Sequence, residues 1–301
     1  MRQVLITLLI GFVLPLKAQT GDFGHARWIG AVTREQANIP AGRNFTGAKL
    51  KESAVKAAWA AVDTLSARSI YLRRSIKLKG AVRQATAYIV GLGFYELAIN
   101  GHKVGDSEFA PLWSDYDKSI FYNTYDVTNI LSTDNSQFSI SVLLGNGFYN
   151  EQGLRYAKMK ISFGPPTLLF RLHIEYQNGT TDDVVSDASW QWALSPITFN
   201  SIYGGEDYDA RMEASPIPSN WRGEWRPVVI QEAPKGVLRP QIAQPVKIME
   251  RYAVKDTIRK DSVLVLDMGQ NLAGFPEITV QGKAGQWLKL TPGERLTRKV
   301  W

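Results

Sequence analysis

The amino-acid sequence predicts an all-β protein, a jelly-roll-like antiparallel β-sandwich followed by a partial second β-sandwich. Two observations carry this prediction. Apolar residues recur in short alternating or continuous runs, each bounded by Gly, Asn, Asp or Pro, and only one stretch is rich in helix formers. Many short strands with turn signals between them and few helices are typical of a β-sandwich.

Residues 1–19 are expected to be a signal peptide rather than part of the fold. A charged start, Met1-Arg2, precedes an apolar run over residues 4–14, and small or polar residues follow at 17–19. The run is shorter than the about 20 apolar residues that a membrane-spanning helix needs. We therefore expect an exported protein, periplasmic or extracellular, with no membrane span in the mature chain.

The composition is that of a globular protein with a sizeable core. Hydrophobic residues make up 45% of the 301 residues, and because there is no cysteine, no disulfide can compensate for weak packing. The net charge of +7 is spread along the chain. A nucleic-acid surface needs clustered Lys and Arg with stacking aromatic residues, so nucleic acid is not an expected partner.

The first sandwich is expected over residues 26–232. It opens with a short strand at 27–30, and the concentration of helix formers at 48–62 predicts a helix or irregular insert. Period-two or continuous apolar runs predict the other strands at 70–76, 85–90, 95–99, 138–144, 167–176 and 190–194. Asn100-Gly101 and Asn178-Gly179 each predict a hairpin turn in which both central residues have positive φ.

The second sandwich is expected to begin at residue 247 and to be truncated. Residues 233–246 contain three prolines, which cannot join a central ladder, so this segment is predicted to be a linker. Residues 247–301 then supply only about three strands, at 262–267, 278–280 and 287–290. That is too few to close a sandwich, because both edges of so small a sheet remain open.

An ordered set of motifs resembles the N-terminal region of bacterial α-L-rhamnosidases, which are glycoside hydrolases. Six segments carry the resemblance to the N-terminal β-sandwich, its closing stretch and the opening of the next sandwich: 87–106, 111–118, 122–128, 144–149, 203–211 and 267–275. Taken in order, the six segments extend the resemblance over nearly all of residues 27–296. The resemblance implies that catalysis in the parent enzymes inverts the anomeric carbon in an α/α barrel well downstream, which this chain lacks.

The loop over residues 111–118 is the candidate carbohydrate site. A sugar needs a flat apolar face for its C–H groups and carboxylates or amides for its hydroxyls, and Trp113, Asp115, Tyr116 and Asp117 supply both. Some relatives of this sandwich have a calcium-dependent rhamnose site. Asp115 and Asp117 could contribute ligands to calcium, which takes about six to eight oxygens, but no full ligand set is identifiable. The alternative is a structural rim loop packed by Trp113.

No catalytic residue is assigned. An inverting glycosidase needs an acid and a base about 6.5–9.5 Å apart on a rigid frame, and no segment shows the repeated amphipathic helices of a barrel. Glu206 and Glu213 are the nearest candidates, and neither is expected to be catalytic. Glu206, Asp207 and Asp209 are expected to belong to a polar connection, with contact to a ligand as the alternative. The three histidines are isolated in the sequence, so zinc chemistry has no support.

Three functions remain open. The first is the accessory, carbohydrate-binding portion of an exported α-L-rhamnosidase-like enzyme that acts on rhamnose-containing oligosaccharides or polysaccharides, with a companion domain or chain for catalysis. The second is a free-standing carbohydrate-binding sandwich, and the third is a structural scaffold without a ligand. The partial second sandwich favours the first function, so the chain alone is expected to be catalytically inactive.

Overall fold

The computed structural model describes residues 23–40, 44–46, 49, 51–132, 136–152, 155, 159–212, 224–260 and 263–294. The expected signal peptide lies outside these residues. Within them, none of the helices has the length and apolar character needed to cross a membrane. The chain divides into two compact units, Met1–Val246 and Lys247–Trp301, which are described separately.

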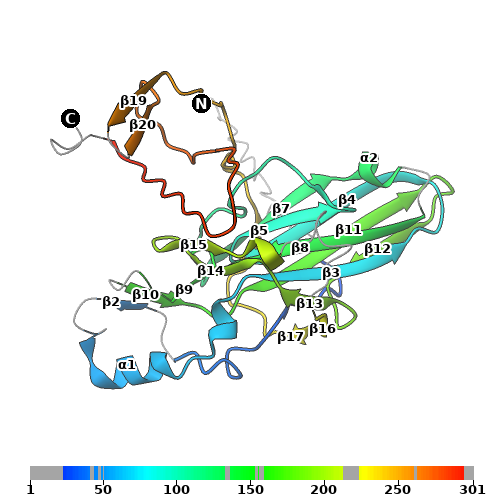
Figure 1. Ribbon diagram of the computed structural model, residues 1–301. Coiled ribbons are helices and arrows are strands. Elements are labelled where there is room, and N and C mark those ends of the chain that lie inside the picture. The colour runs from blue at the N-terminus through cyan, green and yellow to red at the C-terminus, as the bar shows by residue number, and fades with distance from the viewer. Residues whose placement is uncertain are drawn as a thin grey trace, which may run out of the picture. The chain divides into compact units, whose positions relative to one another are not determined.

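The first unit is built from two main β-sheets (Figure 1). One sheet has the order β17 (Val229–Ile230), β1 (Ile29–Gly30), β11 (Thr167–Tyr176), β4 (Val82–Leu92), β7 (Ser119–Asp126) and β18 (Val237–Pro240), with β12 (Thr181–Val185) also paired to β11. The other has the order β16 (Arg226–Pro227), β13 (Gln191–Leu194), β3 (Ile70–Lys77), β8 (Gln137–Leu144), β5 (Tyr95–Ile99) and β6 (His102–Lys103). The two sheets confirm the predicted all-β sandwich.

Smaller elements complete this unit. They are a three-stranded sheet of β2 (Asn44–Thr46), β10 (Met159–Ser162) and β9 (Asn150–Glu151), a hairpin of β14 (Ile197–Ser201) and β15 (Gly205–Tyr208), the helices α1 (Ser53–Ala60) and α2 (Thr128–Leu131), and the 3₁₀ segments η2 (Thr64–Ala67) and η3 (Ala210–Met212). Helix α1 lies inside the stretch of helix formers that predicted it.

The main core lies between the two sheets. Alternate residues of β8 point inward, and fully buried side chains such as Leu72, Ile140 and Phe170 come from strands of both sheets. Trp190 packs edge-on against Phe170 with ring centres 5.5 Å apart, and its buried N–H donates to the Val185 carbonyl oxygen at 2.9 Å. Apolar burial of this kind is the dominant stabilising contribution to such a fold.

A second core covers the other face of the first sheet. Val90, Leu92 and Leu169 are buried there against aromatic side chains that include Tyr116 and Tyr149. Both faces of β4 are therefore covered near its C-terminal end, which explains why its last four residues are all buried. Strands that are covered on both faces have continuous apolar runs in place of alternation, and β4 and β11 each contain such a run.

The two predicted hairpins form, but they use different turns. Asn100 and Gly101 have φ of 50° and 79° between the paired residues of β5 and β6, as predicted. Between β11 and β12 only Gly179 has positive φ, at 84°, and its N–H donates to the Tyr176 carbonyl oxygen at 3.0 Å. The expected positive φ at Asn178 is wrong, because its side-chain oxygen instead accepts from the Thr180 N–H at 3.0 Å, which fixes a local turn.

The segment expected to be a linker contains a strand of the first unit. Residues 237–240 form β18, which pairs in parallel with β7 at one edge of the sheet. Proline is tolerated at an edge, since its missing N–H need not join a ladder. Gln241 continues this attachment by donating its backbone N–H to the Tyr122 carbonyl oxygen at 2.9 Å.

The second unit contains one described hairpin, formed by β19 (Asp256–Lys260) and β20 (Val263–Asp267). The strand predicted at 262–267 is confirmed over Val263–Asp267, whereas the strands predicted at 278–280 and 287–290 are wrong. Residues 278–290 are exposed and irregular, because no described strand supplies a partner for their backbone groups. No described residue of this unit is buried.

Candidate functional site

Five aromatic side chains from four separate segments meet on the first unit, and we call them the aromatic cluster: Phe94, Phe109, Trp113, Phe148 and Tyr203. Phe148 is the hub, with ring-centre distances of 6.1 Å to Phe94, 5.4 Å to Trp113 and 6.5 Å to Tyr203. Trp113 is 65% exposed and Tyr203 is 49% exposed. Clustered exposed aromatic groups of this kind mark a surface for a ligand or a partner.

Two glycines allow the segments that carry Phe94 and Phe148 to touch. Gly93 has φ of 122°, and a Cβ atom there would lie 2.0 Å from the Gly145 carbonyl oxygen. Gly147 has φ of 49°, and its Cβ would lie 2.9 Å from the Phe94 nitrogen. The Gly145 N–H donates to the Phe94 carbonyl oxygen at 2.8 Å. Only residues without a Cβ permit this approach, which brings the two phenyl rings together.

The loop that carries Phe109 and Trp113 is held by the last residues of the first unit. The Glu108 N–H donates to the Val246 carbonyl oxygen at 2.8 Å, and the Leu112 N–H donates to Gln241 Oε1 at 2.9 Å. Phe109 itself has φ of 52°, which is uncommon for a residue with a side chain. Such a conformation persists where the surrounding contacts determine it.

A buried carboxylate fixes the hairpin tip that carries Tyr203. Glu151 is 2% exposed and accepts hydrogen bonds from Ser201 Oγ at 2.8 Å and the Ile202 N–H at 3.0 Å. Ser201 Oγ in turn accepts from the Gly204 N–H at 2.7 Å. The tip between β14 and β15 is therefore tied to the body of the sandwich, and Tyr203 is presented from a defined position.

The structure separates Tyr116 from the other residues predicted for the carbohydrate site. Trp113, Asp115 and Asp117 are exposed, whereas Tyr116 is 5% exposed and packs on Tyr149 at a ring-centre distance of 5.1 Å. Burial raises the pKa of the Tyr116 hydroxyl. Tyr116 is thus a residue of the second core and not of the exposed surface.

Asp115 organises the loop that follows Trp113. Its carboxylate lies 3.0 Å from Lys118 Nζ and accepts from the Asp117 N–H at 3.2 Å. The hydrogen bond from Lys118 holds the pKa of Asp115 below its usual value. Asp115 therefore offers an ionised acceptor at neutral pH, two residues from the exposed indole of Trp113.

Asp115 and Asp117 are the two residues that could contribute ligands to calcium. Asp115 and Asp117 are exposed, and Asp115 is already engaged by Lys118. Across the described parts of the chain, no group of three or more His, Asp or Glu side chains is arranged to hold a metal ion. Calcium takes about six to eight oxygen ligands, so the full ligand set stays unidentified.

The acidic residues of the closing motif form local ion pairs. Asp207 pairs with Arg155, and Asp209 lies 2.7 Å from Arg211. Burial raises the pKa of Glu206. Glu213 lies outside the described residues. The ion pairs of Asp207 and Asp209 agree with the expected polar connection.

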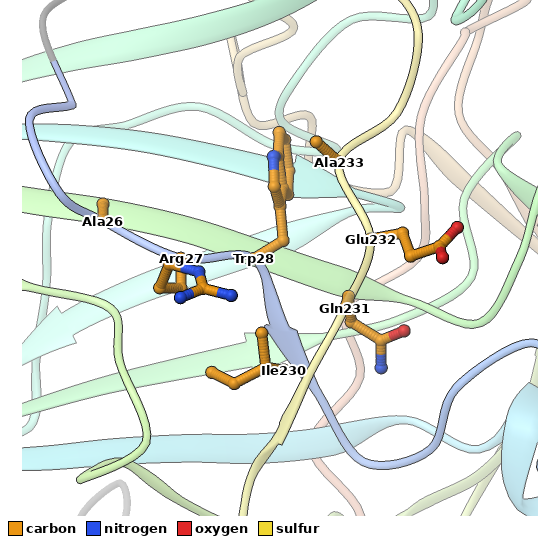
Figure 2. Close-up of a pocket in the computed structure, with 7 residues that line it drawn as sticks. All are labelled: Ala26, Arg27, Trp28, Ile230, Gln231, Glu232 and Ala233. Atoms are coloured by element: carbon orange, nitrogen blue, oxygen red, sulfur yellow. The ribbon is translucent and has the colours of Figure 1, made fainter.

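A pocket of about 550 Å³ lies where β1 meets β17 (Figure 2). Figure 2 shows Arg27 and Glu232 on opposite sides of it, and Trp28 extending toward Ala233. Trp28 is only 9% exposed, so it offers no aromatic face for a sugar to stack on. The pocket is therefore a weaker carbohydrate site than the aromatic cluster.

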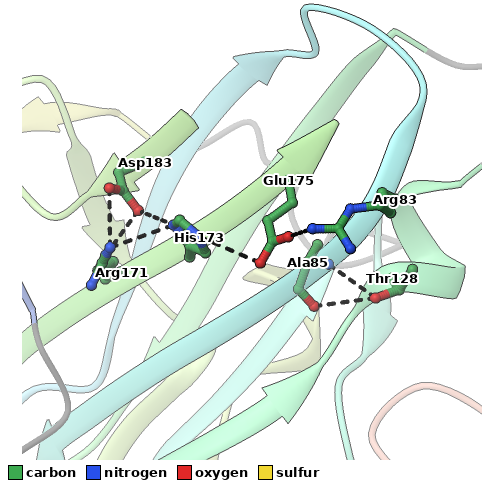
Figure 3. Close-up of polar contacts among 7 residues, drawn as sticks. All are labelled: Arg83, Ala85, Thr128, Arg171, His173, Glu175 and Asp183. Atoms are coloured by element: carbon green, nitrogen blue, oxygen red, sulfur yellow. Dashed lines mark hydrogen bonds and ion pairs between the residues drawn. The ribbon is translucent and has the colours of Figure 1, made fainter. Parts of the chain in front are cut away.

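A charged network lies on β11 and its neighbours (Figure 3). Arg171 Nε lies 2.8 Å from Asp183 Oδ1, His173 Nδ1 lies 2.9 Å from the same oxygen, and Glu175 pairs with Arg83. These groups lie on the neighbouring strands β4, β11 and β12, and His173 is paired directly with Asp183. Their charges pair with one another across strands, and cross-strand pairs of opposite charge stabilise a sheet.

Sequence reasoning identified Trp113 but missed the other members of the aromatic cluster. Phe148 lies in the motif Gly145-Asn146-Gly147-Phe148, and Tyr203 opens the closing motif. Each is an aromatic residue beside glycine in a predicted loop, and this pattern is the signal that could have indicated them. Glu151, in contrast, has no local signal, because its role depends on contacts with residues 50 positions away.

The motifs and the sandwich agree with comparisons of the chain with known proteins. Residues 80–250 match the α-L-rhamnosidase N-terminal domain, and residues 257–300 match the bacterial α-L-rhamnosidase concanavalin-like domain. The chain is 32% identical to an α-L-rhamnosidase of Formosa agariphila over 91% of its own length and 29% of that protein. It is also 32% identical to one from Streptomyces avermitilis, over 94% of its length and 28% of that protein.

Solved structures give the same result. The chain superposes on an α-L-rhamnosidase of Aspergillus terreus with a TM-score of 0.64 and 27% identity, over 83% of this chain and 26% of that one. The Streptomyces avermitilis enzyme in complex with L-rhamnose has a TM-score of 0.58 and 31% identity, over 70% of this chain and 21% of that one. The chain thus spans less than a third of the relatives that it matches. Its N-terminal and concanavalin-like domain matches show that it belongs to the α-L-rhamnosidase family.

Proposed function

We propose that the first unit binds rhamnose-containing glycans within an exported α-L-rhamnosidase, and that it does so through the aromatic cluster and the loop of Trp113. The observation that carries this proposal is the 65% exposed Trp113 side chain two residues before the ionised Asp115. An aromatic face packs against the C–H groups of a sugar ring, and a carboxylate accepts hydrogen bonds from its hydroxyls. Export rests on the N-terminal apolar run.

The Trp113 ring is held in place before a ligand arrives. Its ring centre lies 5.4 Å from that of Phe148, and the two ring planes are inclined by 32°. The close backbone contacts at Gly93 and Gly147 in turn fix the position of Phe148. Tyr116 anchors the loop from the buried side. A binding surface that is already ordered loses less conformational entropy on binding, which favours affinity.

Hydrolysis is proposed to require polypeptide other than the described residues. Their longest helix is α1, which has 8 residues, and they contain no α/α barrel. We therefore expect the purified chain to release no product from an aryl α-L-rhamnoside. Activity that is lost on Glu206→Gln would contradict this expectation.

Calorimetry with L-rhamnose and rhamnose-containing oligosaccharides tests the binding site. Trp113→Ala and Asp115→Ala should each weaken binding by about 1–3 kcal/mol, because one removes the stacking face and the other a charged acceptor. Trp287→Ala, which removes a 98% exposed indole from the second unit, is the matched control and should leave affinity unchanged. If both loop variants bind like the unmodified chain, the loop is structural and the proposal is wrong.

A further inference from the structure

The aromatic cluster has three exposed rings, of which Phe109, 57% exposed, packs on Phe94. Trp113 and Tyr203 are 65% and 49% exposed, and both contact Phe148, which is only partly exposed. They belong to segments about 90 positions apart in the chain, namely the 111–118 loop and the β14–β15 hairpin. Phe148 therefore lies between two of the three exposed rings, Trp113 and Tyr203.

These two rings do not lie in one plane. Trp113 is inclined by 32° to Phe148, whereas Tyr203 is inclined by 80° to it. The exposed faces of Trp113 and Tyr203 are therefore steeply inclined to each other. A single pyranose ring that lies flat on one of them cannot also lie flat on the other.

The two positions are set by independent attachments to the sandwich. The Trp113 loop is hydrogen-bonded to Gln241, at 2.9 Å, whereas the Tyr203 tip is tied to the buried carboxylate of Glu151 through Ser201, at 2.8 Å. The distance between the two exposed rings is thus a property of the folded unit and not of one flexible loop. Ordered, separated contacts of this kind favour a ligand long enough to reach both.

Given the proposed carbohydrate function, on which this inference rests, we infer that the cluster binds a glycan chain across at least two neighbouring sugar units. One unit packs on Trp113 and the next on Tyr203. Tyr203 is then a ligand-binding residue that selects for oligosaccharides over a single sugar, while Trp113 contributes to both.

The test measures affinity against ligand length by calorimetry, with methyl α-L-rhamnoside and α-linked rhamnose di- and tetrasaccharides as probes and the full chain as the protein. The disaccharide should bind about tenfold more tightly than the monosaccharide. Tyr203→Ala should abolish this gain and leave monosaccharide affinity unchanged, and Tyr203→Phe should retain the gain because it keeps the ring. Trp113→Ala should weaken binding of every probe.

Controls separate the inference from the proposed function. Tyr208→Ala removes another tyrosine of the same hairpin, 51% exposed, and should bind all probes normally. Equal affinity for all lengths, or equal losses for monosaccharide and disaccharide in Tyr203→Ala, would overturn the inference alone. Failure of the unmodified chain to bind any probe would overturn the proposed function and this inference together.

Discussion

A single methyl group at Gly93 tests the packing that builds the aromatic cluster. In Gly93→Ala the new Cβ would meet the Gly145 carbonyl oxygen at 2.0 Å and the Asn146 carbonyl oxygen at 3.2 Å. Both obstacles are backbone atoms, which cannot rotate away as a side chain could. The loop after β8 must therefore move, and the hydrogen bond from the Gly145 N–H to Phe94 is strained or lost.

The expected loss of stability has two parts. A φ of 122° costs about 1–3 kcal/mol for a residue with a Cβ, and forcing an extra carbon into a packed region costs about 1–3 kcal/mol more. We therefore expect Gly93→Ala to lower the free energy of unfolding by about 2–6 kcal/mol. In a domain of this size, each kcal/mol lowers the melting temperature by about 2–4 °C.

Gly179→Ala is the matched control for the backbone part. Gly179 has φ of 84°, but nothing lies within 4 Å of the position that its Cβ would take. This variant should lose only about 1–2 kcal/mol. Urea denaturation and thermal melting of both variants give the comparison. If Gly93→Ala is no less stable than Gly179→Ala, Gly93 does not approach the Gly145 carbonyl oxygen closely. The two glycine-containing segments then do not bring Phe94 and Phe148 together in the way proposed.

Three further changes test other parts of the first unit. Glu151→Ala leaves the Ser201 hydroxyl and the Ile202 N–H without their buried acceptor. The free energy of unfolding, measured in urea, should therefore fall by about 2–4 kcal/mol. An unchanged value would contradict this expectation. Partial burial opposes ionisation of Asp183, but hydrogen bonds from Arg171 and the neighbouring histidine hold its pKa below 3.8. The stabilisation by this carboxylate is therefore present at neutral pH and is lost as the pH falls through the folded-state pKa. Asp183→Asn should be less stable than the unmodified chain at pH 7, and urea titrations at decreasing pH should show the difference disappearing; a constant difference would refute the assignment. A chain that ends after Val246 keeps the acceptor of the hydrogen bond that the Glu108 N–H donates, and it removes the exposed apolar residues of the second unit. It should be at least as soluble, with an unchanged melting temperature, and a decrease in either would show that the second unit supports the first.

Local patterns predicted most of the fold. The strands at 70–76, 138–144 and 167–176 are confirmed because period-two or continuous apolar runs follow directly from the side-chain geometry of a strand. The Asn100-Gly101 hairpin is confirmed because positive φ at both positions is a property of those two residues. The family is also confirmed, because the six ordered motifs that indicate it can be read from the amino-acid sequence without the structure.

The tertiary structure decided which strands and loop residues have partners. Apolar runs at 278–280 and 287–290 are not strands in the described second unit, because a strand also needs a neighbour for its backbone groups. Tyr116 lies among the predicted sugar-binding residues in sequence, yet Tyr149 and Phe163 enclose it in the core. Its burial depends on residues far along the chain, which sequence proximity does not specify.

What the sequence by itself determined is therefore the family, the sandwich class, its main strands and one exposed aromatic residue of the site, Trp113. Only the tertiary structure assembled Trp113 with Phe148 and Tyr203, since these rings come from segments that are separated in the chain. The physical reason is that strand formation and turn geometry are governed by neighbouring residues, whereas a binding surface depends on side-chain exposure and distance after the chain has folded.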